Sequence, residues 1–396
     1  MKIDKAFSVE DLRKAAKRRL PRIAFDFIEG GVESEHGIAR NERIFSQCRL
    51  LPRYFVDVSK TSQKTTIFGK TYDSPFGISP TGTPDLWRPG AEALLAETAG
   101  ELNIPFLLST AGNNTVEDAA RLARGNLWFQ LYTTRNRAIA DSLIGRAKDS
   151  GVETLVVTAD VPVAPSRERN MRNGFSRPLR KTLSLMLDGM SHPSWTWNYL
   201  RSGGMPLMGS FAGYAPPAAT PDQVADFFTT QLPTPDQTWR DFEHLRAMWP
   251  GNLVIKGILH PDDARRAAEI GANGIYVSNH GGRQLDGAPS PLEVLPAIRE
   301  AVPGQTIVMD SGFRRGADII MAMAMGVDLV LLGRAPLYGV SAFGREGAHK
   351  MVSILRREID LNLRQIGCPD INDLDERFVV PPPAIHFGNG RPAFRS

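Results

Sequence analysis

Eight short apolar runs recur between residues 76 and 332, and they constrain the fold more than any other feature of this chain. Most of them end in a polar residue. They cover residues 76–79, 106–109, 127–130, 155–158, 253–256, 275–278, 307–310 and 329–332. Strands that are buried on both faces have this continuously apolar character, which is typical of parallel sheets.

Segments of helical length separate the runs. Thr115 is a candidate N-cap for a helix over residues 117–123, and Pro261 opens another helix with two aspartates in its first turn. Eight strand–helix units predict an α/β fold of the (β/α)8 TIM barrel type. An open, doubly wound sheet would favour a glycine-rich turn after the first strand. Residues 80–84, Pro-Thr-Gly-Thr-Pro, match that fingerprint poorly.

Two parts of the chain stand outside this repeat. Residues 1–73 are predicted to form a helical N-terminal extension, with a basic amphipathic segment at 9–19. Residues 161–239 form a long insertion after the fourth strand, and loops of this length are usually functional or disordered. We predict one domain over residues 1–396, with the barrel at 74–366.

Within the insertion, residues 171–215 combine basic residues with apolar ones, and Asp188 is the only acid. The basic residues are Arg172, Arg177, Arg180, Lys181 and Arg201. The apolar residues include Phe175, Leu183, Leu185, Met186, Leu187, Trp195, Trp197 and Tyr199. This composition suits the interface of an anionic bilayer. The alternative is a lid that packs on the mouth of the barrel.

Composition narrows the classes of function. A net charge of +4 over 396 residues gives no indication of nucleic-acid binding. Cys48 and Cys368 lack metal-ligand spacing, so we expect free thiols in a reducing compartment and no metal site. The chain opens without a secretory signal and holds no apolar run of ~18 residues that could span a membrane. We therefore expect a protein of the cytoplasm or of a membrane surface.

Polar residues that end the strands are expected to meet at one rim of the barrel. His280 follows the sixth strand and shares the loop at 278–286 with Arg283. An imidazole can accept a proton, and a guanidinium can bind a carboxylate through two parallel hydrogen bonds. Asp160 could hold the imidazole and raise its pKa, or it could be an ordinary N-cap. Lys256 ends the fifth strand, where a buried ammonium requires an anion, an electron-rich cofactor or a salt bridge.

The last two strand–helix loops indicate a phosphate site. Residues 310–316, Asp-Ser-Gly-Phe-Arg-Arg-Gly, follow the seventh strand, and Gly333 and Arg334 follow the eighth. Glycines let backbone N–H groups approach an anion closely, and arginine adds a forked donor. Many barrel enzymes bind a phosphate at this position. The two loops therefore indicate a phosphate-containing ligand, but they do not indicate which reaction the protein catalyses.

Four segments carry a resemblance to a known family: residues 278–286, Ser-Asn-His-Gly-Gly-Arg-Gln-Leu-Asp, with 310–316, 128–132 and 256–257. The chain resembles the FMN-dependent α-hydroxy-acid dehydrogenases and oxidases over nearly its whole length. Within that family, the insertion is most similar to the membrane-associated bacterial L-lactate dehydrogenases. The segment at 367–371 is closer to the mandelate dehydrogenases.

The resemblance implies a role for each matching residue at the substrate. His280 is the base that removes a substrate proton, and Asp160 pairs with its imidazolium. Arg283, helped by Arg167, binds the substrate carboxylate, and Tyr132 hydrogen-bonds near the reacting carbon. Whether the substrate carbon loses a proton or a hydride stays open.

The resemblance also implies FMN as the cofactor. Lys256 would offset negative charge on the reduced flavin. The residues implied at the flavin ring and ribityl chain are Pro80, Thr81, Gly82, Ser109, Gln130, Thr158 and Ser278. Those implied at the ribityl chain and phosphate are Asp310, Gly312, Arg314, Gly333 and Arg334.

Three positions distinguish members of the family, and two of them depart from its pattern here. Phe27 stands where the family usually has a tyrosine that binds the substrate carboxylate, which removes one hydrogen bond worth ~1.5–3 kcal/mol at most. Ala111 stands where glycolate oxidase has a tryptophan, which predicts a roomier pocket for a bulky or aromatic side chain. Gly82, where many oxidases carry alanine, favours a dehydrogenase.

The resulting hypothesis is an FMN-dependent dehydrogenase that oxidises a lactate- or mandelate-like L-2-hydroxy acid and passes the electrons to a membrane quinone-type acceptor. The resemblance also implies a homo-tetramer and peripheral contact with the cytoplasmic side of the cell membrane. The main alternative is a soluble oxidase that produces hydrogen peroxide. The others are an impaired FMN binder that docks through the insertion, and an FMN-barrel isomerase.

Overall fold

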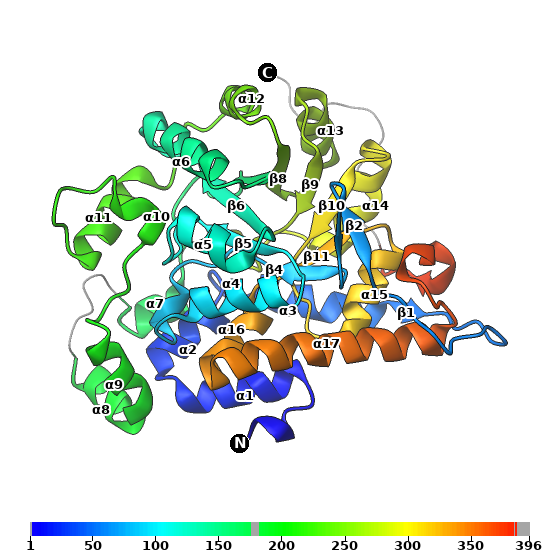
Figure 1. The fold of residues 1–396 in the computed structure, drawn as a ribbon, viewed down its shortest axis with the longest axis horizontal. Coiled ribbons are helices and arrows are strands. Elements are labelled where there is room, and N and C mark those ends of the chain that lie inside the picture. Colours follow the sequence, from blue (N-terminus) through cyan, green and yellow to red (C-terminus); the bar gives the residue numbers. More distant parts are fainter. Residues whose placement is uncertain (1, 176–181, 384, 386–396) are drawn as a thin grey trace.

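The computed structural model describes residues 2–175, 182–383 and 385, and its centre is a closed barrel of eight parallel strands (Figure 1). The strands follow chain order around the barrel, and the last pairs with the first. They are β4 (Phe76–Ile78), β5 (Phe106–Ser109), β6 (Leu127–Tyr132), β7 (Thr154–Thr158), β8 (Asn252–Ile258), β9 (Gly274–Val277), β10 (Thr306–Met309) and β11 (Leu329–Leu332). The predicted (β/α)8 barrel is confirmed.

Helices follow the strands and cover the outside of the barrel. They are α4 (Ala91–Glu101), α5 (Val116–Ala123), α6 (Arg137–Asp149), α12 (Trp239–Met248), α13 (Pro261–Ile270), α14 (Pro291–Ala301), α15 (Gly316–Ala324), α16 (Arg334–Phe343) and α17 (Arg345–Ile366). Thr115 caps α5 as predicted, because its side chain accepts a hydrogen bond from the backbone of Asp118. Every residue of β5 and β7 is buried, which explains why the central residues of these strands are apolar.

The N-terminal extension is only partly helical. It contains η1 (Ile3–Lys5), α1 (Val9–Arg19), α2 (Arg22–Glu29), α3 (His36–Arg43), η2 (Ile44–Gln47), β1 (Arg49–Leu50), β2 (Thr65–Ile67) and β3 (Lys70–Tyr72). The β2–β3 hairpin places Ile67 and Tyr72 among the side chains that fill the barrel, and Trp128 Nε1 donates to the Tyr72 hydroxyl at 3.2 Å. The hairpin thus closes the end of the barrel where the strands begin. Its strands were too short to be recognised in the sequence.

The C-terminal segment returns to this extension. Beyond α17 the chain forms η4 (Ile371–Asp373), η5 (Glu376–Phe378) and β12 (Val379–Val380), and β12 pairs antiparallel with β1. The C-terminal segment is thereby attached to the end of the N-terminal extension's helical part.

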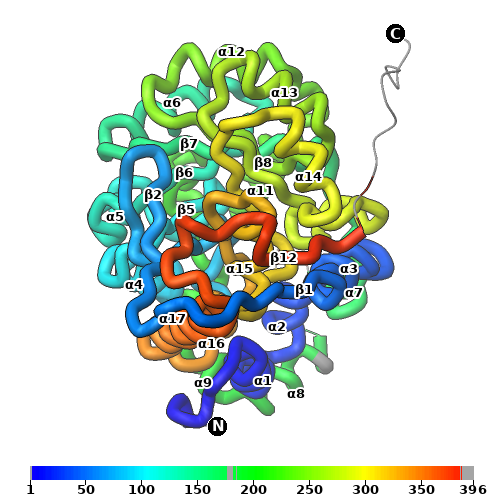
Figure 2. Tube along the Cα trace, turned by 90° about the vertical axis from the view of Figure 1, so that its right-hand side faces the viewer, coloured from blue at the N-terminus to red at the C-terminus, as the bar shows by residue number. Residues whose placement is uncertain are grey.

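The insertion folds as α7 (Glu168–Arg172), α8 (Leu183–Ser191), α9 (Pro193–Arg201), α10 (Gly209–Ala212) and α11 (Pro221–Gln231), before α12. In both views α8 and α9 lie beside α1, at the edge of the molecule opposite α12 and α13 (Figures 1 and 2). Arg177, Arg180 and Lys181, predicted as part of a basic membrane surface, lie outside the described residues. None of the described helices is long and apolar enough to cross a bilayer.

The helices α8 and α9 form a hairpin, the α8–α9 hairpin, with two unlike faces. One face exposes large apolar side chains to solvent: Leu183, Met186, Leu187, Met190, Trp197 and Leu200. The other face packs on the rest of the protein, and Trp195 on that face is buried. The apolar residues predicted as one surface therefore divide between a buried and an exposed side.

Candidate functional site

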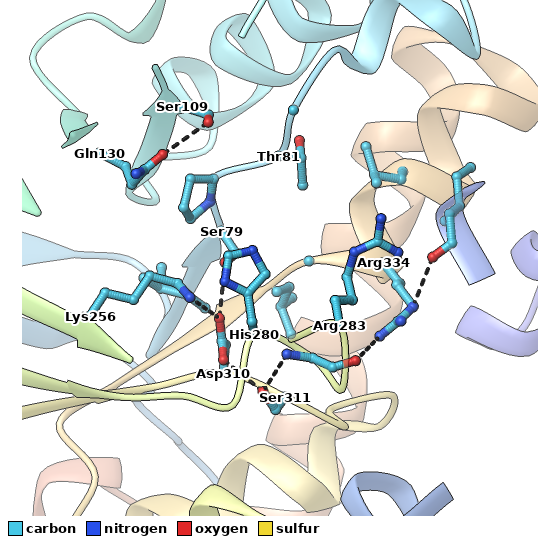
Figure 3. Close-up of a pocket in the computed structure, with 18 of the residues that line it drawn as sticks. Ser79, Thr81, Ser109, Gln130, Lys256, His280, Arg283, Asp310, Ser311 and Arg334 are labelled. Atoms are coloured by element: carbon cyan, nitrogen blue, oxygen red, sulfur yellow. Dashed lines mark hydrogen bonds and ion pairs between the residues drawn. The ribbon is translucent and has the colours of Figure 1, made fainter. Parts of the chain in front are cut away.

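The ends of the barrel strands surround a cavity that opens to solvent (Figure 3). Most of the residues predicted for the site line it: Pro80, Thr81, Gly82, Ser109, Gln130, Tyr132, Thr158, Lys256, His280, Arg283, Asp310, Gly312, Arg314, Gly333 and Arg334. The other three, Asp160, Arg167 and Ser278, are not part of its lining.

His280 and Asp160 form the hydrogen bond that the sequence predicts. His280 Nδ1 lies 2.9 Å from Asp160 Oδ1, which leaves Nε2 as the ring nitrogen free of this bond. Gly257 makes this approach possible, because a Cβ atom at that position would lie 2.5 Å from the Cβ of Asp160. Gly257 also has a φ of +100°, which favours glycine.

The imidazole of His280 is neutral at neutral pH. Burial lowers the pKa of His280, and the positive charge of Lys256 lowers it further, while Asp160 raises it in part. The expected effect of Asp160 is present, but burial outweighs it. Burial opposes ionisation of Asp160 as well, yet His280 and Lys256 together hold the pKa of Asp160 below its usual value. A neutral imidazole beside a carboxylate can accept a proton and keep it as an ion pair.

Lys256 is a buried cation at the cavity wall, only 3% exposed. Its Nζ donates to the hydroxyl of Ser278 at 3.0 Å and lies 3.8 Å from a carboxylate oxygen of both Asp160 and Asp310. Among the described residues, that oxygen of Asp160, Oδ2, has no hydrogen-bond partner. The ammonium therefore has loose contacts with two carboxylates and can interact with a ligand in the cavity.

Ser278 and Asp310 link the strand ends into one polar network. Ser278 donates to Asp310 Oδ1 at 2.6 Å and accepts the backbone N–H of His280 at 3.0 Å. The buried Tyr276 hydroxyl donates to Asp310 Oδ2 at 2.9 Å. Ser278 therefore uses its hydroxyl to fix Lys256, Asp310 and His280, and does not present it to the cavity.

A second hydrogen-bonded row comes from three neighbouring strands. Ser109 donates to Gln130 Oε1 at 2.9 Å, and Gln130 Nε2 donates to the Thr158 hydroxyl at 2.9 Å (Figure 3). These two bonds fix the orientation of the Gln130 amide. The row gives the cavity a flat polar wall from β5, β6 and β7.

Two partly buried arginines near His280 have no carboxylate partner among the described residues. Arg283 donates to the carbonyls of Phe27 and Gly30, at 3.0 Å and 2.6 Å. Arg167 reaches Gln284 at 3.5 Å, and its Nε has no hydrogen-bond partner among the described residues. Burial lowers the pKa of Arg283, and the charge of Arg167 lowers it further. Such an excess of positive charge in a buried site favours an anionic ligand.

The loops after β10 and β11 form a second site for an anion. Gly312 has a φ of +93°, and a Cβ atom there would lie 2.0 Å from the carbonyl oxygen of Asn41, so only glycine fits. Arg314 and Arg334 both line the cavity beside the N-terminus of α16, of which Gly333 is the N-cap. Two guanidinium groups and a helix N-terminus together suit a phosphate.

Aromatic residues from outside the barrel form the remaining wall. Phe27 in α2 and Trp87, which follows the turn η3 (Pro84–Leu86), both line the cavity with ring centroids 6.0 Å apart. Ala111 also lines the cavity, next to Gly82, where an added Cβ atom would lie 3.4 Å from the Cβ of Ala111. Phe175 extends the cluster, with its ring 4.8 Å from that of Phe27.

Several lining residues were not recognised in the sequence: Ile28, Ser79, Trp87, Gly281, Ser311, Phe313, Leu331, Leu332 and Leu337. Trp87 lies in the loop after the first barrel strand, and that position alone was a usable sign of a cavity residue. The others are small or aliphatic residues and one phenylalanine, close in the sequence to predicted ones, and their types carry no chemical signal.

Comparison with known proteins gives consistent matches over most of the chain. Residues 16–381 match the model of the family described as FMN-dependent dehydrogenase. The (S)-mandelate dehydrogenase of Pseudomonas putida is 42% identical over 373 residues, which cover 94% of this chain and 93% of that protein. The L-lactate dehydrogenase of Acinetobacter baylyi is 37% identical over 94% of this chain and 97% of that protein.

Comparison with solved structures also identifies an (S)-mandelate dehydrogenase. The crystal structure of the monotopic membrane protein (S)-mandelate dehydrogenase superimposes with a TM-score of 0.91. Its sequence is 40% identical, and the match covers 95% of this chain and 100% of that one.

Proposed function

Because the chain belongs to the FMN-dependent dehydrogenase family, and is therefore an oxidoreductase that uses FMN, we propose that it oxidises an L-2-hydroxy acid with an aromatic side chain to the 2-oxo acid. The observation that carries the proposal is the pairing of a neutral base with unneutralised guanidinium groups in one cavity. His280 is held by Asp160 at 2.9 Å, while the partners of Arg283 and Arg167 within the described part of the chain are neutral carbonyl and amide groups.

The residues of the cavity fit FMN. Gly312, with Arg314 and Arg334, suits its phosphate, and the polar row of Ser109, Gln130 and Thr158 suits the edge of a flat ring with several hydrogen-bonding atoms. Further residues proposed to hold FMN are Pro80, Thr81, Gly82, Lys256, Asp310 and Gly333. Ser278, which lies outside the cavity lining, would act by holding Lys256 and Asp310 in place. When bound, FMN accepts the two electrons that the substrate loses. The incompletely neutralised ammonium of Lys256 would stabilise the negative charge that this transfer creates nearby.

His280 moves the proton. Nδ1 is engaged with Asp160, so Nε2 is the nitrogen that accepts a proton from the substrate. Asp160 then stabilises the imidazolium in a buried site, where an unpaired cation would be costly. The network through Ser278 holds the His280 backbone, so the base keeps its position while its charge changes.

Arg283 and Arg167 orient the substrate through its carboxylate. A forked donor fixes a planar carboxylate in one orientation, which places the neighbouring carbon next to the base. Burial raises the pKa of Tyr132, so its hydroxyl remains a hydrogen-bond donor at neutral pH. Tyr132 can therefore hold an oxygen of the substrate close to the reacting carbon.

The aromatic wall supports a large apolar side chain on the substrate. Phe27 and Trp87 offer aromatic rings to the cavity, Phe175 packs on Phe27, and the small side chain of Ala111 favours a bulky substrate group. A methyl group, as in lactate, would leave much of this wall without contacts. The (S)-mandelate dehydrogenase named above acts, by its name, on a substrate of this kind.

The exposed face of the α8–α9 hairpin supports peripheral contact with an anionic membrane on its cytoplasmic side. Its apolar residues include Trp197 and Leu200, each about two-thirds exposed, at 66% and 67%. Exposed apolar patches of this kind bind bilayer interfaces, and Arg201 at the end of α9 adds a positive charge that anionic lipids attract. A membrane quinone is accordingly the electron acceptor that we propose.

Anaerobic titration of the FMN-loaded protein with hydroxy acids tests the proposal. We expect (S)-mandelate to bleach the flavin absorbance, with (S)-lactate and glycolate acting more weakly. Absence of bleaching with every 2-hydroxy acid would contradict the proposal and favour an impaired FMN binder or an isomerase. Slow reoxidation in air, together with rapid reoxidation by a soluble quinone, is expected of a dehydrogenase. Rapid reoxidation in air would instead indicate an oxidase.

A further inference from the structure

Two tryptophans of α9 lie two residues apart and have opposite environments. Trp197 is 66% exposed on the apolar face of the α8–α9 hairpin, whereas Trp195 is 6% exposed on the other face. The indole Nε1 of Trp195 donates to the carbonyl oxygen of Leu86 at 3.0 Å. The ring of Trp195 also stacks on that of Tyr199, with centroids 4.9 Å apart. Trp195 is thus the contact between the hairpin and the turn η3.

The turn η3 leads directly into the wall of the cavity. Leu86 is its last residue, and Trp87 follows at once. Trp87 is 2% exposed, lines the cavity, and donates from Nε1 to the carbonyl of Ala24 in α2 at 3.1 Å. The hydrogen bond from Trp195 therefore fixes the peptide group that precedes a wall residue.

The same face of the hairpin also holds α2, which supplies the other aromatic wall. Asp188 accepts the backbone N–H of Arg22, the first residue of α2, at 2.7 Å. Arg19, just before α2, donates to the hydroxyl of Ser194 at 3.1 Å. The carboxylate of Asp188 lies at the positive end of a helix, where it is stabilised. Phe27 lies in this helix and faces Trp87 across 6.0 Å.

We propose that Trp195 is a positioning residue for the pocket that receives the substrate side chain. The α8–α9 hairpin holds η3 through Trp195 and α2 through Asp188, and these two elements carry Trp87 and Phe27. The α8–α9 hairpin, which lies outside the barrel, thereby sets the distance between the rings of Trp87 and Phe27. The inference rests on the proposed oxidation of an aromatic hydroxy acid, because the pocket is defined by that substrate. It does not involve the polar end of the cavity, where the proton is moved.

The test compares Trp195→Phe with Trp197→Phe in the FMN-loaded protein. The first variant removes the N–H and keeps an aromatic ring, and the second makes the same change on the exposed face. Binding is measured from the flavin spectrum with phenylacetate and propionate, which lack the hydroxyl and cannot be oxidised. Turnover is measured with (S)-mandelate and (S)-lactate.

We expect Trp195→Phe to raise the Kd of phenylacetate and the KM of mandelate about fivefold, the effect of losing one neutral hydrogen bond. Propionate binding, the KM of lactate and both kcat values should stay near those of the parent protein. Trp197→Phe should change none of these. Equal weakening of both ligands, or no change with either, would overturn the positioning role.

Asp188→Asn provides a second variant, which remains informative even if the protein does not fold with a substitution at Trp195. It keeps the size of the side chain but weakens its bond to the N-terminus of α2, and it should show the same selective loss with aromatic ligands. An unchanged ratio of phenylacetate to propionate binding would count against the inference. Should the parent protein fail to oxidise any hydroxy acid, the proposed function fails. If the parent protein is active but the variants weaken aromatic and aliphatic ligands equally, the proposed function holds and only the positioning role of Trp195 is refuted.

Discussion

The two ends of the cavity are built in different ways. At the polar end, the chemical groups come from the barrel strands or from the loops that follow them, and His280, Lys256 and Asp310 are joined through Ser278. At the aromatic end, Phe27 and Trp87 come from α2 and from the loop after β4, and segments of the insertion hold both in place.

Because of this difference, we expect the polar end to carry out the chemical step and the aromatic end to select the substrate. The buried network at the polar end leaves few free hydrogen-bonding groups, so a change of one member disturbs the others. The aromatic rings are held by a few single bonds to appended segments, and those bonds do not reach the network around His280. Arg283 is the link between the two ends, because it donates to the carbonyls of Phe27 and Gly30. We therefore expect changes at the polar end to alter the chemical step, and changes at the aromatic end to alter the choice of substrate.

His280→Ala should give the largest effect and would break the polar end. Loss of the base is expected to slow flavin reduction by about 10⁴-fold, at the upper limit for general base catalysis, with FMN still bound. Anaerobic stopped-flow absorbance measures the rate, and His244→Ala on the surface helix α12 is the control. Reduction at a near-normal rate would show that His280 is not the base.

Arg283→Lys should give the next largest effect. A lysine keeps the charge but cannot provide the forked donor, and each hydrogen bond to a charged group is worth about 1.5–3 kcal/mol. We expect the KM of both aromatic and aliphatic acids to rise by about 100-fold, which corresponds to two such losses at the lower value. Arg121→Lys, on an exposed position of α5, is the matched control. An unchanged KM would remove Arg283 from carboxylate binding.

Phe27→Tyr sharpens the comparison because it adds a polar group to the aromatic end. The ring of Phe27 lies 5.3 Å from the guanidinium carbon of Arg283, so a hydroxyl there can reach a carboxylate bound by that arginine. One added bond to a charged group should lower the KM of mandelate and lactate alike, by about tenfold. Phe7→Tyr, at an exposed position, is the control. A KM that stays constant would mean that position 27 only shapes the pocket.

The pH dependence should give a smaller effect that belongs to the polar end. His280 must be neutral to accept a proton, so kcat/KM falls as the pH drops through its pKa. Burial places that pKa below its ordinary value of 6.5, so the acid limb should lie below pH 6.5. Asp160 raises the pKa of His280, and Asp160→Asn should therefore move the limb to lower pH. A limb above pH 6.5 would contradict the burial argument.

The barrel and its polar end were largely predictable from the sequence. Buried parallel strands are continuously apolar, and a strand that ends in Lys256 or Asp310 places a polar group at the rim in a way that needs no tertiary information. The loop that holds His280 and Arg283 was specific enough to indicate a base and an anion site. The family resemblance then named the cofactor.

The aromatic end was less predictable because it depends on contacts between distant segments. Phe27 and Ala111 were recognised only as departures from a family pattern, and Trp87 was not recognised. The separation of Trp195 from Trp197 depends on which side of α9 packs against η3, and the composition of the insertion does not reveal this. The β2–β3 hairpin was missed for a similar reason, because its three-residue strands are stabilised by Ile67 and Tyr72 inside the barrel.

Anaerobic flavin reduction by (S)-mandelate and (S)-lactate in Ala111→Trp tests the division of tasks most directly. A tryptophan would fill the space beside Phe27 and Trp87 without touching the network around His280. We expect the ratio of kcat/KM for mandelate to that for lactate to fall by about tenfold or more, while the limiting rate with lactate stays close to the parent value. An unchanged ratio, or a collapse of the limiting rate with lactate, would contradict the separation of chemistry from selectivity.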